Sequence, residues 1–179
     1  MPEIEIRPMI ESDMPILMGL EHNYRSHYVW QMDLAVDAGQ TTIVFREVRL
    51  PRPVDVDYPR QPMAVLQEWK DAAVVLVAEH EGVPAAYIVI QEDMAPSTAW
   101  ITDLVVAPSL RRQGIGSTLM LAAQSWAVQR GSRRMVLETQ SKNHAGISMA
   151  LKLGFEFSGY HDRYFLNQDI ALFFARFLR

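Results

Sequence analysis

The chain has 179 residues, of which 49% are hydrophobic and 21% are charged, with a net charge of −4 and no cysteine. This composition favours one globular domain over residues 1–179, and it excludes disulfides, thiolate metal sites and a cysteine nucleophile. The negative charge argues against a nucleic-acid partner, and the chain has neither an apolar run of about 18 residues nor a signal-like N-terminus, so we expect no membrane partner and a cytoplasmic protein.

The first third of the chain predicts strands and one helix before an irregular stretch. Ser12 suits the N-cap of a helix over Asp13–Asn23, in which Pro15 is tolerated in the first turn. Four prolines between Pro51 and Pro62 predict a stiff loop. The other segments predicted here are a strand over Glu3–Arg7, a short helix within Tyr24–Asp37 and a strand over Thr41–Leu50.

The rest of the chain alternates between strand and helix patterns. Glu81-Gly82 lies between two apolar runs and is a hairpin signal. Ile115–Gln129 repeats apolar residues at helical spacing, which predicts a helix. The remaining predictions are strands over Ala72–Glu79, Ala85–Gln91, Ala99–Val106 and Arg134–Thr139, and a helix over Ala145–Leu153 that Gly154 ends. The apolar segment Ile170–Leu178 fits a strand or a helix, and we favour a strand.

The order of these elements predicts the fold class. The strand–helix–strand unit over Trp100–Thr139 should be parallel and right-handed, whereas strands linked by hairpins should be antiparallel. We therefore predict a mixed α/β (α+β) fold in a single domain. Its core should be one sheet of about seven mostly antiparallel strands, with helices on both faces.

Arg111–Gly116 is the most informative segment of the sequence. It reads Arg-Arg-Gln-Gly-Ile-Gly and lies between a predicted strand and a predicted helix. Glycines in that place expose backbone N–H groups at a helix N-terminus, and the arginines add positive charge, so the segment predicts a phosphate site. The alternative is a plain turn. No lysine follows Gly116 as in a nucleotide P-loop, and the third glycine of a dinucleotide motif is absent.

The same segment resembles the Arg/Gln-x-x-Gly-x-Gly/Ala loop that binds acetyl-CoA in the GNAT superfamily of N-acetyltransferases. The resemblance continues at Asn143 and at Leu153-Gly154-Phe155, and it covers residues 100–155. Leu-Glu-Thr-Gln (137–140) and Asp-Ile-Ala-Leu-Phe-Phe (169–174) resemble streptothricin-type acetyltransferases within that superfamily. The resemblance implies a GNAT fold, acetyl-CoA as co-substrate and transfer of an acetyl group to an amine.

The resemblance also implies residue roles. Backbone groups of Leu104, Val105 and Val106 would pair with the pantetheine arm, and one N–H would polarise the thioester carbonyl. Asn143 would bond the same arm. The pyrophosphate would be held by Arg111, Arg112, Gln113, Gly114, Ile115, Gly116 and Ser117.

The sequence departs from the family at the residue that returns a proton to the CoA thiolate. The family's usual tyrosine, seven residues after Asn143, is replaced by Ala150. The usual alanine, three residues after Asn143, is replaced by Gly146. Tyr160 or Tyr164 could act instead. The thiolate could also leave unaided, since a thiol has a pKa of about 8.5 and its anion is a fairly good leaving group.

Two acidic residues within predicted strands are candidates for the base that accepts the amine's proton. Asp103 lies beside the proposed carbonyl site, and Glu138 lies on the neighbouring strand. Each could instead be a structural carboxylate. Without a cysteine or an identifiable activated serine, we predict direct attack in a ternary complex. The histidines show no metal-ligand spacing, so no metal is expected.

Acidic residues among aromatic ones predict where an organic cation would bind. Asp33 lies in the aromatic stretch, and Asp55 and Asp57 lie in the proline-rich loop. We therefore predict acetylation of a primary amine on a small cationic molecule, although these residues could merely solvate a loop. The alternatives are a peptide or protein N-acetyltransferase and a non-catalytic acyl-CoA-binding regulatory module, and a homodimer is left open.

Overall fold

The computed structural model describes residues 2–67 and 69–178, and its centre is a seven-stranded sheet in the order β1-β4-β5-β6-β7-β9-β8. Strands β6 and β7 pair in parallel, and the other neighbouring pairs are antiparallel. The predicted mixed, mostly antiparallel sheet is confirmed. The strands are β1 (Glu5–Pro8), β4 (Val74–His80), β5 (Val83–Gln91), β6 (Thr98–Val106), β7 (Arg134–Gln140), β8 (Glu156–His161) and β9 (Ala171–Phe177).

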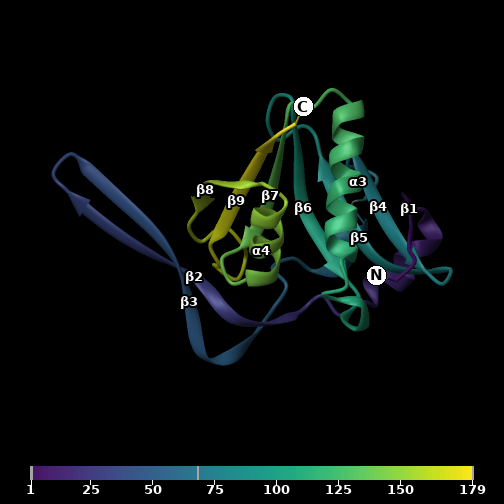
Figure 1. The fold of residues 1–179 in the computed structure, drawn as a ribbon, viewed down its shortest axis with the longest axis horizontal. Coiled ribbons are helices and arrows are strands. Elements are labelled where there is room, and N and C mark those ends of the chain that lie inside the picture. The colour runs from purple at the N-terminus through teal and green to yellow at the C-terminus, as the bar shows by residue number, and fades with distance from the viewer. Residues whose placement is uncertain (1, 68, 179) are drawn as a thin grey trace.

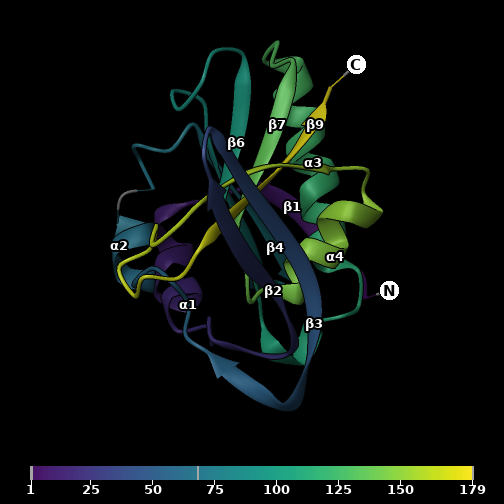
Figure 2. The ribbon, with the colours of Figure 1, turned by 90° about the vertical axis from the view of Figure 1, so that its left-hand side faces the viewer.

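Helices cover both faces of the sheet, as predicted, and Figure 2 shows α1 and α2 on one side of it and α3 and α4 on the other. Helices α3 and α4 pack on the face that carries Ile88, Ile101 and Leu137, whereas α1 packs on the face that carries Tyr87 and Val105. Across the described part of the chain, no helix is long and apolar enough to cross a membrane. The helices are η1 (Glu11–Asp13), α1 (Met14–Met18), α2 (Pro62–Gln67), η2 (Pro108–Leu110), α3 (Ile115–Gln129) and α4 (His144–Lys152).

Turn residues fix the best-predicted elements. Glu81 and Gly82 have φ angles of 51° and 77°, and positive values at both residues are those of the two-residue turn that the sequence predicts between β4 and β5. Gly114 has a φ of 92° at the N-cap of α3, which glycine adopts without steric strain. The predicted hairpin and the predicted helix are therefore confirmed.

The helix predicted over Asp13–Asn23 is wrong in its extent, because α1 ends at Met18. Ser12 does not cap it. The Asp13 carboxylate instead accepts the Ile10 N–H at 2.9 Å and pairs with an arginine of β1. The helix ends where the chain turns inward to bury His22 against the sheet.

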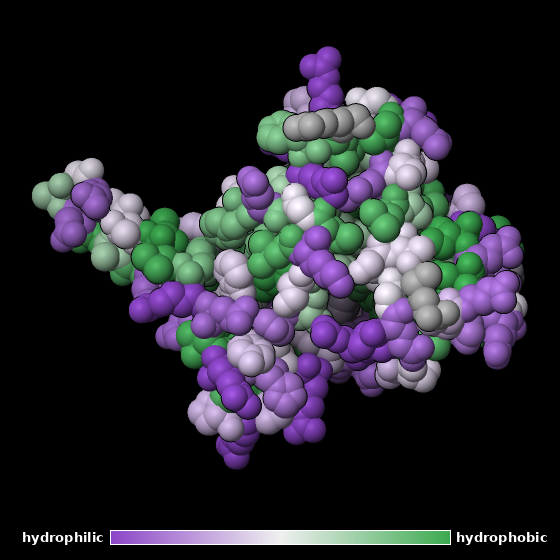
Figure 3. Space-filling model, viewed as in Figure 1, coloured by the Kyte–Doolittle hydropathy of each residue, from purple (hydrophilic) through white to green (hydrophobic). Residues whose placement is uncertain are grey.

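A long antiparallel hairpin, β2 (Tyr24–Asp37) with β3 (Gln40–Val56), projects from the sheet as an arm (Figures 1 and 3). It corrects two predictions, the short helix within Tyr24–Asp37 and the irregular loop from Pro51 onward. The prolines at 51 and 53 lie between Arg49 and Val54, where the pairing register shifts. The ladder therefore loses no hydrogen bond to their missing N–H groups.

One face of the arm is apolar, because Trp30, Met32, Leu34 and Val36 occupy every second position along β2. At the base of the arm, the Trp30 ring packs edge-on against Phe174 of β9 with centroids 5.7 Å apart. The backbone N–H of Trp30 also donates to the Ser141 carbonyl after β7 at 2.9 Å. These contacts fix the start of β2 beside α4 and the end of β7.

Candidate active site

Strands β6 and β7 separate halfway along their length. Their described parallel pairing runs over Thr98–Ile101 opposite Arg134–Leu137 and goes no further. Leu104, Val105 and Val106 still pair with β5 on their other side. The edge of β6 that faces β7 is therefore open over these three residues, and an extended chain can pair with it there.

A groove of about 600 Å³ lies beside this opening. Its walls come from β6, from the loop before α3, from α4 and from the start of β2. The structure brings nine of the eleven predicted acetyl-CoA residues into its lining, which are Leu104, Val105, Val106, Arg111, Arg112, Gly114, Gly116, Ser117 and Asn143. Gln113 instead donates to the Ser109 carbonyl, and the Ile115 side chain is buried in the core.

The loop before α3 presents bare backbone to the groove. The first N–H groups of an α-helix have no partner within the helix, and they carry partial positive charge. A Cβ at Gly116 would lie 3.3 Å from Met149 Sδ and 3.4 Å from the Leu104 side chain. Glycine therefore keeps this end of the groove open, and exposed Arg112 adds a positive charge beside it. This donor set fits the pyrophosphate of acetyl-CoA.

Arg111 has a different set of partners from the one that the sequence predicts. Its guanidinium donates to the carbonyls of Val106 at 2.8 Å and Asn23 at 2.9 Å, and also to that of Glu21. Burial lowers the pKa of Arg111. The side chain thus ties the end of β6 to the segment before β2, and a phosphate contact from it stays a prediction.

Asn143 caps α4 as well as lining the groove. Its Oδ1 accepts the Gly146 N–H at 2.9 Å, and its Nδ2 donates to Thr139 Oγ1 at 3.0 Å. A Cβ at Gly146 would lie 2.7 Å from that Nδ2, so glycine leaves room for the amide to fold over the helix N-terminus. The contact of Asn143 with pantetheine stays a prediction.

Asp103 and Glu138, the two predicted bases, are buried on the opposite face of the sheet from α3 and α4, and we call them the carboxylate pair. Arg60 lies between them. Its guanidinium forms ion pairs with Glu138 and, at 3.5 Å, with Asp103 Oδ1, and it donates to the Thr102 carbonyl at 2.8 Å. Burial opposes the charge on Arg60, but the two carboxylates outweigh it and raise its pKa. Two negative charges therefore face one positive charge.

Neutral donors complete the surroundings of the carboxylate pair. The Tyr58 hydroxyl donates to Asp103 Oδ1 at 2.6 Å. Trp100 Nε1 and the Tyr164 hydroxyl each donate to Glu138 Oε2 at 3.1 Å. Glu138 is thus held by donors on both oxygens, whereas the contacts of Asp103 within the described residues fall on Oδ1.

The two tyrosines predicted as acids lie in different places. Tyr164 reaches the carboxylate pair through Glu138. Tyr160 does not, because its ring packs edge-on against Phe45 of the arm at 5.3 Å. Ala150 is fully buried in the core, so the structure has no room there for the tyrosine that the family often carries.

Residues 43–155 match the model of the acetyltransferase (GNAT) family. The chain belongs to the GNAT family. It is an acetyl-CoA-dependent N-acetyltransferase, and acetyl-CoA is its co-substrate. The membership of the GNAT family that the loop before α3 and Asn143 predict is therefore confirmed.

Within GNAT, the chain is similar to proteins named as acetyltransferases of antibiotics. Streptothricin acetyltransferase of Streptomyces lavendulae is 25% identical over 160 residues, 87% of this chain and 82% of the relative. Aminoglycoside N(6')-acetyltransferase type 1 of Klebsiella aerogenes is 38% identical over 65 residues, 36% of this chain, and the match spans 43% of that relative. A crystal structure of nourseothricin acetyltransferase shares the fold with a TM-score of 0.81 and 20% identity, over 98% of this chain and 99% of that one.

The sequence predictions place no catalytic or acetyl-CoA-binding role on several residues that this GNAT chain brings to the site. His22 and Tyr24 line the groove together with Tyr58. His22 Nδ1 lies 2.7 Å from the Leu20 carbonyl, so that nitrogen carries the proton and Nε2 accepts the hydroxyl of a β5 tyrosine. Burial lowers the pKa of His22, which keeps the ring neutral. The Tyr24 hydroxyl donates to Gln140 at 2.7 Å.

The acids predicted to hold the acceptor make other contacts in the structure, and their contact with an acceptor stays a prediction. Asp33 pairs with Arg46 on the arm. The Asp55 side chain is 90% exposed and lies 3.6 Å from Arg25, and Asp57 Oδ1 lies 3.5 Å from Asn23. Among the described residues that line the groove, none of these three acids is present.

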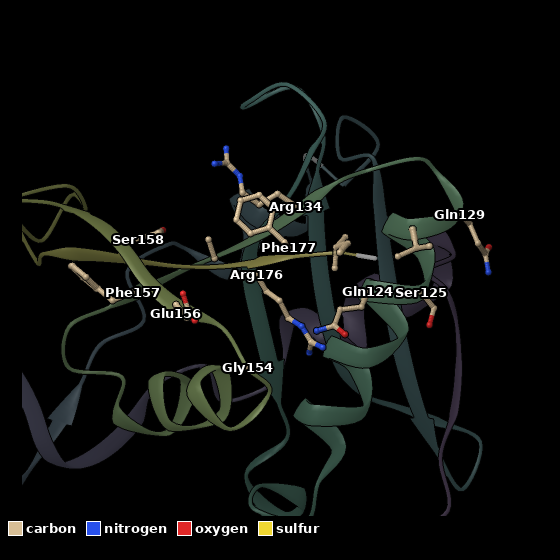
Figure 4. A pocket seen from close by; sticks show the side chains of 13 residues that line it. Gln124, Ser125, Gln129, Arg134, Gly154, Glu156, Phe157, Ser158, Arg176 and Phe177 are labelled. Atoms are coloured by element: carbon tan, nitrogen blue, oxygen red, sulfur yellow. The ribbon is translucent and has the colours of Figure 1, made fainter.

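A second cavity, of about 860 Å³, lies between α3 and strands β8 and β9. Figure 4 shows Arg176 and Gln124 projecting into it from opposite sides. It is larger than the groove, but its described lining contains neither the glycine loop nor the open edge of β6. The groove is therefore the candidate site for acetyl-CoA.

Proposed function

We propose that this GNAT enzyme acetylates a primary amine of a small cationic molecule by direct attack on acetyl-CoA in a ternary complex. The observation that carries the proposal is the opening between β6 and β7, with the groove on one side and the carboxylate pair on the other. Such an opening lets two substrates meet within the sheet from opposite faces.

The groove side suits acetyl-CoA. An extended pantetheine arm would pair with the open edge of β6 over Leu104–Val106. Its pyrophosphate would bind the backbone N–H groups before α3, with Arg112 beside them. A backbone N–H at Leu104 or its neighbour would then donate to the thioester oxygen, where negative charge develops during attack.

The opposite side suits a cation. The carboxylate pair has one arginine in contact, so a negative charge remains without a cationic partner among the contacts described. Burying a charge is unfavourable unless it is paired, and an ammonium group would supply the partner. Two relatives named for their action on an aminoglycoside and on streptothricin support a small-molecule acceptor.

The chemistry then needs one base. The bound amine first loses its ammonium proton to water and then attacks the thioester carbon as a neutral nitrogen; the C–N bond forms and the C–S bond breaks. Asp103 takes the proton that the nitrogen loses, because Oδ2 remains available while Oδ1 accepts from Tyr58. Glu138, which accepts from three donors, stabilises the positive nitrogen.

The test is release of CoA from acetyl-CoA with matched panels of polyamines, aminoglycosides, neutral amines and peptides. We expect turnover with cationic small molecules and little with neutral amines of the same size. Turnover confined to peptides would contradict the small-molecule assignment. Binding of acetyl-CoA without turnover on any amine would contradict the whole proposal.

A further inference from the structure

The buried Ala150 leaves this enzyme without the family's usual proton donor for the CoA thiolate. A different side chain can take that role if it lines the groove and also has a source of protons. Among the described tyrosines near the opening, Tyr24 lines the groove but donates to Gln140, and Tyr164 contacts the carboxylate pair but is not part of the lining. Tyr58 meets both conditions.

The position of Tyr58 is fixed from two sides. Its hydroxyl lies 2.6 Å from Asp103 Oδ1, and Asp103 directly precedes Leu104, whose backbone lines the groove. Its ring meets the buried, neutral His22 edge-on with centroids 5.3 Å apart. The hydroxyl is therefore held between the predicted base and the end of the groove where the thioester would lie.

The environment keeps this hydroxyl protonated until Asp103 changes its charge. Burial, and the negative charge of Asp103 after it, raise the pKa of Tyr58 well above its usual value of 10. When Asp103 gains a proton from the amine, that charge disappears and the phenol becomes a better donor. Loss of the amine proton and release of the thiol proton are thereby coupled.

We propose that Tyr58 is the catalytic acid that protonates the leaving CoA sulfur, with Asp103 as the residue that recharges it. The inference rests on the proposed function. As the C–S bond breaks, its electron pair goes to sulfur and takes the Tyr58 proton. Asp103, which holds the proton from the amine nitrogen, passes it to the phenolate. One proton has then moved from nitrogen to sulfur, and both side chains end as they began.

The first test is Tyr58→Phe, which keeps the ring against His22 and removes only the hydroxyl. We expect kcat to fall by about 10²-fold or more, with the Kd for acetyl-CoA unchanged in calorimetry. Tyr160→Phe removes the same group outside the site and should leave both constants unchanged. A Tyr58→Phe enzyme that keeps the wild-type kcat overturns the proposal.

A second test separates chemistry from packing. Tyr58→Gly opens a space for added phenols, and we expect them to restore turnover more strongly as their own pKa falls toward neutrality. Recovery that ignores the pKa of the phenol, or no recovery by any phenol, overturns the acid role. If wild-type enzyme, Tyr160→Phe and Tyr58→Phe all have the same kcat, the proton relay through Tyr58 is wrong but the proposed acetyltransferase function stands. If wild-type enzyme releases no CoA with any amine, both fail.

Discussion

The two sides of the opening between β6 and β7 are built differently. The groove side comes mainly from one stretch, residues 104–152, and offers backbone N–H groups and glycines. The side with the carboxylate pair, which we call the acceptor side, joins distant segments. Tyr58 and Asp103 are 45 residues apart in the sequence, and Arg60 and Glu138 are 78 residues apart. It works through side-chain charge. The groove can therefore serve any acetyl-CoA enzyme of this fold, whereas the acceptor side is where specificity can change.

Asp103→Asn tests whether the chemistry belongs to the acceptor side alone. The amide keeps an oxygen for Tyr58 but cannot accept the amine proton, so kcat should fall by about 10²- to 10⁴-fold. The Kd for acetyl-CoA, measured by calorimetry, should not change. Asp162→Asn, on an exposed loop, is the control and should alter neither constant. An equal loss in acetyl-CoA affinity would mean that the two sides are not separable.

Arg60→Ala tests the charge balance of the acceptor side. Removing the arginine leaves two buried carboxylates without their cation, and the free energy of unfolding should fall by about 3 kcal/mol in urea titrations. Arg46→Ala removes a comparable arginine–aspartate contact from the exposed arm and should cost about 1 kcal/mol or less.

The stability that Arg60→Ala loses should return in part when Glu138→Gln is added, because one buried charge is then gone. Equal small losses for Arg60→Ala and Arg46→Ala, with no recovery in the double variant, would show that water solvates the carboxylate pair. The acceptor side would then no longer differ from the groove in depending on buried side-chain charge.

Gly116→Val tests the groove side. Its side chain would press on Met149 and Leu104 and narrow the groove, so affinity for acetyl-CoA should fall by about tenfold, or about 1.4 kcal/mol. Ser125→Val makes a similar change on the exposed side of the same helix and should not affect binding. If a folded Gly116→Val protein bound acetyl-CoA normally, this end of the groove would not hold the co-substrate.

The same contrast explains how much of the site the sequence reveals. The loop over Arg111–Gly116 is a local pattern, because neighbouring residues alone create a helix N-terminus, whereas Asn143 follows from the family resemblance and not from its role as a helix cap. Arg60 carries no such pattern. It is one arginine in a proline-rich segment, and its function arises from contacts with strands that fold against it from far along the chain. Asp103 and Glu138 are visible as charges within apolar strands, but not as partners of one arginine.

The fold shows a similar division. The hairpin at Glu81-Gly82 and helix α3 follow from turn residues and helical spacing, and both were predicted. Of the arm, only the strand over Thr41–Leu50 is predicted, because the strand character of β2 and of the end of β3 depends on pairing between them, and the prolines suggest a break. The prolines lie where the register shifts, so no ladder hydrogen bond is lost to their missing N–H groups. That position is a property of the paired strands and cannot be read from β3 alone.

The smallest expected effect separates the acceptor site in the structure from the one that the sequence first indicates. Asp55→Asn combined with Asp57→Asn removes two acids that are exposed and lie outside the groove lining, so the acceptor KM and kcat should each stay within about twofold of wild type. Steady-state kinetics with a polyamine at low and high salt would check this, since distant surface charges act mainly through screened attraction. A rise in KM of about tenfold at low salt would return the acceptor to the proline-rich segment and move it away from Asp103.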